Sequence, residues 1–138
     1  MPVFGERSLN NLKGVHPDLV RVMTEAIKNT PIDFTIVEGV RSLQRQQELY
    51  MQGRTKPGAK VTNADGVRNK SNHQAKPDGF GHAVDIYPYV NGKVDLTASK
   101  ELKIISDHIK SVAKKLGIKI TWGGDFKSIP DAPHFELG

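Results

Sequence analysis

The sequence contains no cysteine among its 138 residues. This absence excludes disulfide bonds, thiolate zinc sites and cysteine nucleophiles, so a transition metal would have to be bound mainly by histidine and carboxylate side chains. The first residues also lack the apolar segment of a secretory signal peptide, and no stretch approaches the roughly 18 apolar residues of a membrane-spanning helix. We therefore expect a soluble protein that is not exported through the usual signal and does not insert into a membrane.

Lysine and arginine exceed aspartate and glutamate by 20 to 15, which gives a net charge of +5 and an isoelectric point of about 9.5. A basic protein is attracted to polyanions such as nucleic acid, a membrane surface or an anionic cell-wall polymer, and charge alone does not choose among them. The basic residues are spread along the chain without an aromatic-rich RNA-binding motif. This pattern argues against specific nucleic-acid recognition and is typical of a solvated surface.

The length of the chain predicts a single domain, 1–138, with one hydrophobic core. Helices are expected at 17–30, 43–52 and 99–116, and strands at 34–37, 82–89, 118–122 and 134–137. The segment 53–80 is rich in Gly, Pro, Asn, Lys and Asp, follows neither period, and predicts a long functional loop. The order of these elements indicates an α+β fold, in which helices pack on a small, mainly antiparallel sheet.

The segment 71–89 has the sequence SNHQAKPDGFGHAVDIYPY, which places two histidines and two aspartates around a Pro-Asp-Gly break. A hydrolytic zinc site needs about three protein ligands and one open position for water. The candidate ligands are His73, Asp85 and His134. Because side chains alternate along a strand, His82 should point away from the face that carries Asp85, so we leave it out of the site.

The last strand follows a loop that contains Asp131, so one short segment can supply both a metal ligand and a general base. Each candidate also has a more ordinary explanation. Histidines near aspartates commonly form surface hydrogen bonds, Asp131 can be a turn former, Arg41 at a strand end can make a surface salt bridge, and Ser71 alone is only a loop residue. His16 and His108 are expected to face solvent.

The stretches SNH, GHAVDIYPY and WGGDFKSIPDAPHFEL resemble the zinc-binding signature Ser-x-His, Ala-x-Asp and acid-x-x-His of the D-Ala-D-Ala peptidase and lysostaphin superfamily. Together with DFTIVEGVRS and LYMQGRTKPGAKVTNADG, they look most like its L-alanyl-D-glutamate endopeptidases, which occur as phage endolysins and bacterial wall hydrolases. The match is ordered and covers residues 33–137. It implies a zinc peptidase that cleaves the L-alanyl-D-glutamate bond of peptidoglycan stem peptides, and we expect the protein to be a monomer.

Carried over motif by motif, the resemblance implies zinc on His73, Asp85 and His134, Asp131 as catalytic base, Arg41 beside the substrate, and Ser71 holding the substrate or the site loop. One departure concerns spacing. The family usually has about seven residues from the histidine to the aspartate, whereas His73 and Asp85 are twelve apart, which indicates an insertion within QAKPDGF. A loop insertion costs little if its ends still meet, so it affects contact with substrate more than the metal site.

Three alternatives stay open: a D-Ala-D-Ala carboxypeptidase of the same fold, a non-catalytic zinc-stabilised binding module like the hedgehog signalling domain, and a basic nucleic-acid binder. Asp131, in register with His134, favours catalysis, because a structural zinc site tends to fill its fourth position with a ligand. The lack of a signal peptide and of a separate wall-binding domain fits a phage endolysin, which is made in the host cytoplasm and acts on the wall after release.

Overall fold

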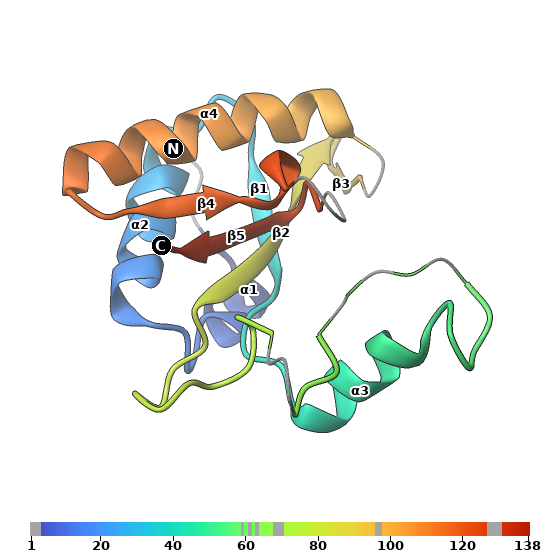
Figure 1. The fold of residues 1–138 in the computed structure, drawn as a ribbon. Helices are drawn as coiled ribbons and strands as arrows, with labels where there is room; N and C mark the ends of the chain where they lie inside the picture. Colours follow the sequence, from blue (N-terminus) through green and yellow to red (C-terminus); the bar gives the residue numbers. More distant parts are fainter. Residues whose placement is uncertain are drawn as a thin grey trace.

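The computed structural model describes residues 4–58, 60, 62, 64–67, 71–95, 98–126 and 131–138. The elements are α1 (Glu6–Asn11), α2 (Pro17–Lys28), β1 (Phe34–Glu38), α3 (Leu43–Met51), β2 (Ala83–Val90), β3 (Lys93–Val94), α4 (Ser99–Leu116), β4 (Ile120–Trp122), the 3-10 helix η1 (Gly123–Asp125) and β5 (His134–Leu137). In Figure 1, α2 and α4 pack beside a small sheet, and α3 lies apart from them. The architecture is α+β, which confirms the predicted fold class.

The strands form an antiparallel sheet in the order β1-β2-β5-β4, with β3 paired to β2 outside this path. The long strand β2 therefore lies between β1 and β5. In this register, Asp85 of β2 lies opposite His134 of β5 on one side and Glu38 of β1 on the other. The sheet thus brings together residues that are far apart in the sequence. Helix α1 was not predicted, because its six residues are too few for a periodic signal.

The hydrophobic core lies between the sheet and the helix pair α2 and α4. Helix α2 begins at Pro17, and the His16 side chain caps it by accepting a hydrogen bond from the Asp18 N–H at 3.1 Å. The main core side chains are Leu19, Val22, Met23, Ala26 and Ile27 from α2, Leu102, Ile105, Ile109 and Ala113 from α4, and Phe34, Ile36, Val84, Ile86 and Phe135 from the sheet. This packing fixes β2 and β5, which carry two of the candidate metal ligands.

The expectation of a long loop at 53–80 is confirmed, whereas the expectation that His108 faces solvent is wrong. The described residues of the segment 53–80 form turns and no helix or strand, as predicted. His108, expected to face solvent, is instead half buried, and its Nε2 donates a hydrogen bond to the Ala26 carbonyl at 2.8 Å. That expectation was wrong because the packing of α4 against α2 covers this position, although its sequence neighbours are polar. His16 is also only partly exposed, since it caps α2.

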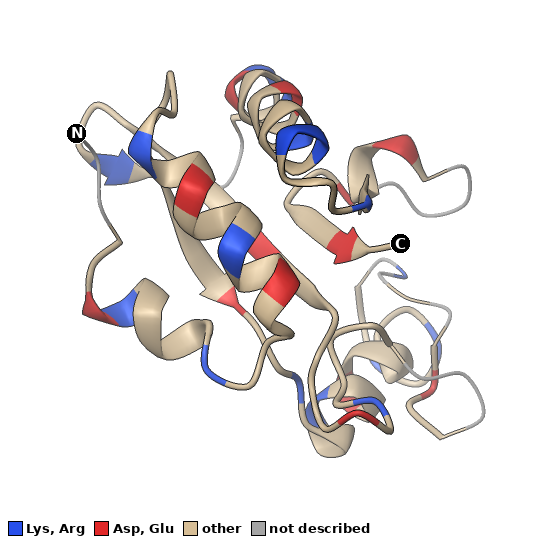
Figure 2. Ribbon diagram, turned by 90° about the vertical axis from the view of Figure 1, so that its left-hand side faces the viewer, with Lys and Arg blue, Asp and Glu red and all other residues tan. Residues whose placement is uncertain are grey.

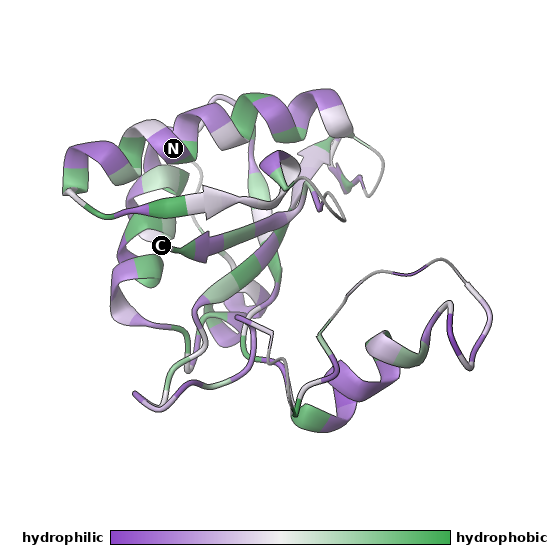
Figure 3. Cartoon of the chain, viewed as in Figure 1, coloured by the Kyte–Doolittle hydropathy of each residue, from purple (hydrophilic) through white to green (hydrophobic). Residues whose placement is uncertain are grey.

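Charged side chains of both signs are interspersed along the helices rather than gathered on one of them (Figure 2). Figure 3 shows that hydrophobic residues concentrate in α2, α4 and the sheet, whereas α3 is largely hydrophilic. Among the described residues, no helix combines the length and the apolar character that would be needed to cross a membrane.

Candidate metal centre and active site

Three candidate ligands converge at the junction of β2, β5 and the turn that precedes β2. His73 Nε2 lies 3.1 Å from Asp85 Oδ1 and 3.0 Å from His134 Nδ1, and His134 Nδ1 lies 3.3 Å from Asp85 Oδ1. Ligand atoms bound to one tetrahedral zinc ion at about 2.0–2.1 Å lie roughly 3.3 Å from each other. The three atoms therefore outline one face of such a tetrahedron, and the residues fit a metal ion.

The second nitrogen of each imidazole is held by an oxygen. His73 Nδ1 donates to the Gly39 carbonyl at 2.9 Å, and His134 Nε2 donates to Glu136 Oε1 at 2.7 Å. These contacts select the tautomers that direct the lone pairs of His73 Nε2 and His134 Nδ1 toward each other. Two lone pairs and a carboxylate oxygen at such short range repel one another unless a cation or a proton lies between them. The arrangement of these three atoms therefore favours a positive charge between them.

The close approach of these groups shifts their pKa values. Burial alone would raise the pKa of Asp85, but hydrogen bonds from His134 and His73 outweigh it and hold this pKa well below its usual range. Burial lowers the pKa of His134, whereas its hydrogen bonds to Asp85 and Glu136 raise it, with a net value of about 9. The hydrogen bond between Asp85 and His134 thus lowers the pKa of the carboxyl group and raises the pKa of the imidazole.

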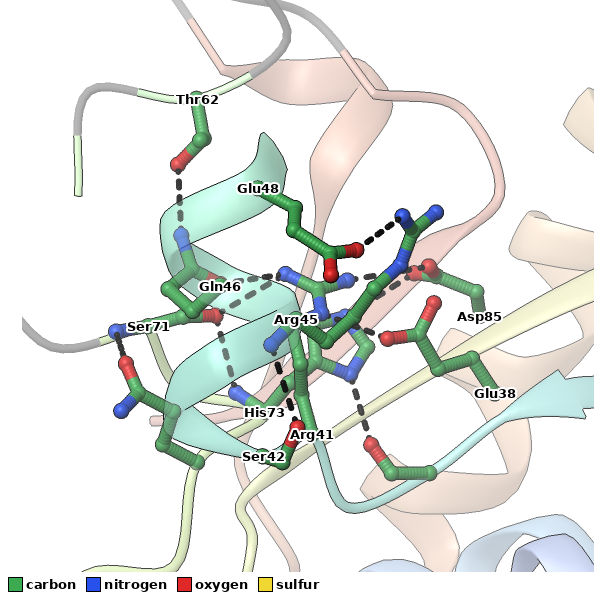
Figure 4. A network of polar contacts seen from close by, with 12 residues as sticks. Glu38, Arg41, Ser42, Arg45, Gln46, Glu48, Thr62, Ser71, His73 and Asp85 are labelled. Atoms are coloured by element: carbon green, nitrogen blue, oxygen red, sulfur yellow. Dashed lines mark hydrogen bonds and ion pairs between the residues drawn. The ribbon is translucent and has the colours of Figure 1, made fainter. Parts of the chain in front are cut away.

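Arg41 lies beside this cluster with its side chain only 10% exposed. Its Nε donates to Glu38 Oε1 at 2.5 Å and its Nη1 to Gln46 Oε1 at 2.8 Å, while Nη2 is 3.7 Å from Asp85 Oδ2. Figure 4 shows the guanidinium group between the carboxylates and α3, with Ser71 nearby. Arg41 therefore makes no isolated surface salt bridge, because it is part of the network around the metal centre.

The backbone around Asp131 fixes its position relative to the metal centre. The Asp131 N–H donates to the Gly123 carbonyl at 2.9 Å, and the Asp131 carbonyl accepts from the His134 N–H at 3.0 Å. Burial raises the pKa of Asp131, and the negative charge of Asp85 raises it further, although nearby cations oppose this. A carboxylate with a raised pKa next to candidate metal ligands has the properties of a general base.

The turn that carries His73 is held mainly by main-chain hydrogen bonds. The Arg41 N–H donates to the His73 carbonyl at 2.8 Å, and the His82 N–H donates to the Asn72 carbonyl at 2.7 Å. The Ser71 hydroxyl accepts from the His73 N–H at 3.1 Å and lies 3.4 Å from Arg41 Nη1. The Ser71 hydroxyl thus contributes one side-chain hydrogen bond to this turn.

The family profile of the phage L-alanyl-D-glutamate peptidase matches residues 2–137. The chain belongs to this family. It is 31% identical over 134 residues to the L-alanyl-D-glutamate peptidase of Escherichia phage T5, covering 97% of this chain and 88% of the relative. It is 36% identical over 135 residues to the peptidoglycan L-alanyl-D-glutamate endopeptidase CwlK of Bacillus subtilis (strain 168), covering 89% of this chain and 73% of the relative.

Solved structures agree with this assignment to the phage peptidase family. The L-Ala D-Glu endopeptidase ChiX of Serratia marcescens superposes with a TM-score of 0.77 at 32% identity, covering 99% of this chain and 91% of that one. The vancomycin-resistance D,D-dipeptidase VanXYg superposes with a TM-score of 0.55 at 19% identity, covering 89% of this chain and 50% of that one. The second likeness concerns the fold alone. The chain is therefore a peptidase with the α+β fold of ChiX.

The segment 74–80, which the spacing from His73 to Asp85 predicts to be an insertion, does not separate these two residues. The Lys76 N–H donates to the Phe80 carbonyl at 3.0 Å, and the Gly79 N–H donates to the Lys76 carbonyl at 2.8 Å. The extra residues thus form a closed turn whose ends return to the same place. His73 Nε2 and Asp85 Oδ1 lie 3.1 Å apart, so the length of this segment does not prevent the two side chains from meeting.

Two supporting residues of the peptidase were not identified from the sequence. The Gln46 side chain is completely buried. Its Oε1 accepts a hydrogen bond from Arg41 Nη1, and its Nε2 donates one to the Ala64 carbonyl at 2.7 Å. Glu136 binds His134 and also accepts from Asn72 Nδ2 at 2.6 Å. Glu136 could have been found, because it lies two residues after a ligand on the same strand face. Gln46 offers no such signal among the exposed polar residues of α3.

Proposed function

We propose that this peptidase is a zinc-dependent endopeptidase that hydrolyses the L-alanyl-D-glutamate bond of peptidoglycan stem peptides. Two of its relatives and the structural neighbour ChiX carry this bond in their names, and CwlK is named for peptidoglycan as well. The likeness to the D,D-dipeptidase concerns the fold only, so it gives no support to a carboxypeptidase. The endopeptidase is therefore the function that the similarities favour.

The metal assignment rests on one observation, which is the convergence of the three ligand atoms of His73, Asp85 and His134 within 3.3 Å of one another. Two imidazoles and one carboxylate are the protein ligands of many catalytic zinc sites, which keep a fourth position open for water. The oxygen partners Gly39 and Glu136 orient the two rings from outside, as in other zinc centres. The donor set thus supports zinc over magnesium or calcium, which prefer oxygen ligands.

Each further step of the proposed hydrolysis is assigned to a different group. Zinc bound here would polarise the scissile carbonyl and bring the pKa of a bound water close to neutrality. Asp131 accepts a proton from the attacking water and can return it to the leaving amine. The guanidinium group of Arg41 stabilises the negative charge that develops on the carbonyl oxygen, or grips a carboxylate of the substrate glutamate. Ser71 holds the turn that carries His73.

Digestion of purified peptidoglycan, followed by mass spectrometry of the products, tests this function. We expect fragments with a new N-terminal D-glutamate, which a chelator abolishes and added zinc restores. Release of free D-alanine instead would identify a carboxypeptidase. No product from a zinc-loaded protein would identify a non-catalytic module, and zinc-independent cleavage would contradict the metal assignment.

A further inference from the structure

A second group of metal-ligating side chains lies next to the segment that leads into β2. Over the described part of the chain, two groups each bring three potential ligand atoms within 4.8 Å of one another. One is the metal centre described above, and the other consists of His16, Asp78 and His82. His16 precedes α2, Asp78 belongs to the insertion, and His82 precedes β2. None of them has a part in the proposed reaction.

The second group repeats the geometry of the first. The rings of His16 and His82 have centroids 5.0 Å apart and planes at 71°, and the two rings of the metal centre have centroids 4.8 Å apart and planes at 70°. A carboxylate oxygen completes each group, and Asp78 Oδ2 lies 2.7 Å from His82 Nε2. Two imidazoles and one carboxylate suit zinc and similar first-row divalent ions. We propose that His16, Asp78 and His82 form a second binding site for such an ion.

The tautomer of His16 determines how strongly this site binds. His16 Nδ1 accepts the hydrogen bond from the Asp18 N–H that caps α2, so in the neutral ring the proton is on Nε2. Coordination through Nε2 would require the proton to move to Nδ1, which lies 4.0 Å from the Asp18 carboxylate and would no longer accept the capping hydrogen bond. The Asp18 N–H would then lose this acceptor. Because this exchange gives up a helix cap, the second ion binds more weakly than the first.

A metal ion at this position would tie the insertion to the start of α2. The two segments already meet through the main chain, since the Gly81 N–H donates to the Gly14 carbonyl at 3.0 Å and the His16 N–H donates to the Gly81 carbonyl at 2.9 Å. Asp78 adds an exposed side chain from the tip of the insertion. Since His82 also bonds the residue before His73, the ion would stabilise the turn that supplies a ligand to the first site.

The test counts metal ions on protein that already carries one zinc per chain. Calorimetric titration with further Zn²⁺, at about pH 7.5 so that ordinary imidazoles are mostly neutral, should show a second and weaker equivalent in the parent protein. Asp78→Asn and His16→Asn should each weaken this second step by at least about tenfold and leave the first zinc in place. Asparagine can still cap α2 at position 16 and still accept from the Phe80 N–H at position 78.

Matched substitutions elsewhere show whether the effect is specific. Asp107→Asn on the exposed face of α4 makes the same chemical change as Asp78→Asn, and His108→Asn removes a histidine outside both groups. Both should keep the second equivalent, and melting curves show that every variant is folded. A parent that binds only one zinc overturns the proposal, and so does a second equivalent that survives Asp78→Asn or His16→Asn. Since the first equivalent is counted separately, failure here leaves the proposed peptidase function untouched.

Discussion

Each imidazole of the metal centre has one nitrogen fixed by the protein and the other presented to the site. The carbonyl of Gly39 and the carboxylate of Glu136 hold the outer nitrogens of His73 and His134, and both hydrogen bonds are shorter than 3.0 Å. Neither ring can rotate without breaking its outer bond, so the ligand geometry exists before a metal arrives. This preorganisation lowers the entropic cost of binding the ion and raises the basicity of the ligands.

The Arg41→Lys substitution tests whether a planar fork is needed beside the metal centre. Lysine keeps the charge, but its single nitrogen cannot bond Glu38 and Gln46 while it also faces the substrate. We expect kcat/KM for peptidoglycan fragments to fall by about 10²–10³-fold with zinc content unchanged. The exposed Arg45→Lys on α3 is the matched control and should retain its activity. Normal turnover of the Arg41→Lys enzyme would show that the fork has no role in catalysis.

The Asp131→Asn substitution separates proton transfer from metal binding. The amide has nearly the same size and leaves the main-chain bond to the Gly123 carbonyl in place, but it cannot accept a proton from water. We expect cleavage to fall by roughly 10²–10⁴-fold while zinc stoichiometry and melting temperature stay close to those of the parent. The exposed Asp125→Asn serves as the control for the lost charge.

Two other results of the Asp131→Asn experiment would change the assignment. Retained zinc with near-normal cleavage would eliminate Asp131 as the general base. Lost zinc together with a lower melting temperature would make Asp131 a metal ligand, because metal affinity is linked to folding. That outcome would favour a structural zinc module.

Among the structural elements, η1 and the loop before β5 approach each other too closely for any side chain at Gly123. A Cβ atom there would lie 2.1 Å from the Asp131 carbonyl oxygen and 2.8 Å from the His134 Cβ. The glycine thus permits the approach that positions the general base and one metal ligand together. This close contact is thus a property of how η1 packs against the segment before β5, and it does not depend on a single functional group.

Gly123→Ala should therefore disturb the fold and the site together. The methyl group must push the Asp131 loop away from η1, and we expect a loss of about 1–3 kcal/mol in the free energy of unfolding, with weaker zinc binding. Gly5→Ala is the control for the same chemical change, because its Cβ meets no atom within 4 Å and its φ of −78° is open to alanine, so it costs only the weaker N-capping of α1 by alanine. Urea unfolding and zinc titration measure both effects. Equal stability of the two variants would contradict the close approach.

At the scale of the whole molecule, most of the fold and of the candidate site could be predicted from hydrophobic periodicity and from motifs that occur in the expected order. The periodicity located α2, α4 and the main strands. The residue pattern predicted the three ligands and the resemblance agreed with them, and the sheet register pairs two of them, Asp85 and His134. The Gly39 carbonyl, which orients His73, was not predicted because this contact joins segments 34 residues apart, whereas Glu136 lies only two residues from His134 and offered a local signal. Gln46 reads as one more polar residue of a surface helix, yet it is buried against Arg41. The cluster of Asp78 with His16 and His82 likewise depends on how the insertion folds back.

Removal of zinc should weaken the whole fold, because the proposed ligands His73 and His134 are 61 residues apart in the chain and lie on different segments. With free zinc at about 100 times the dissociation constant, binding to the native state alone contributes about 2.7 kcal/mol. For a domain of this size, we expect chelation to lower the melting temperature by roughly 10 °C and to abolish cleavage, and zinc to restore both. The Asp78→Asn variant should keep most of this shift, since the first site dominates. Calorimetry gives the melting temperature, and metal analysis of the same sample gives the zinc content. If zinc-free protein melts at the same temperature as the zinc-loaded protein, no metal links these two segments.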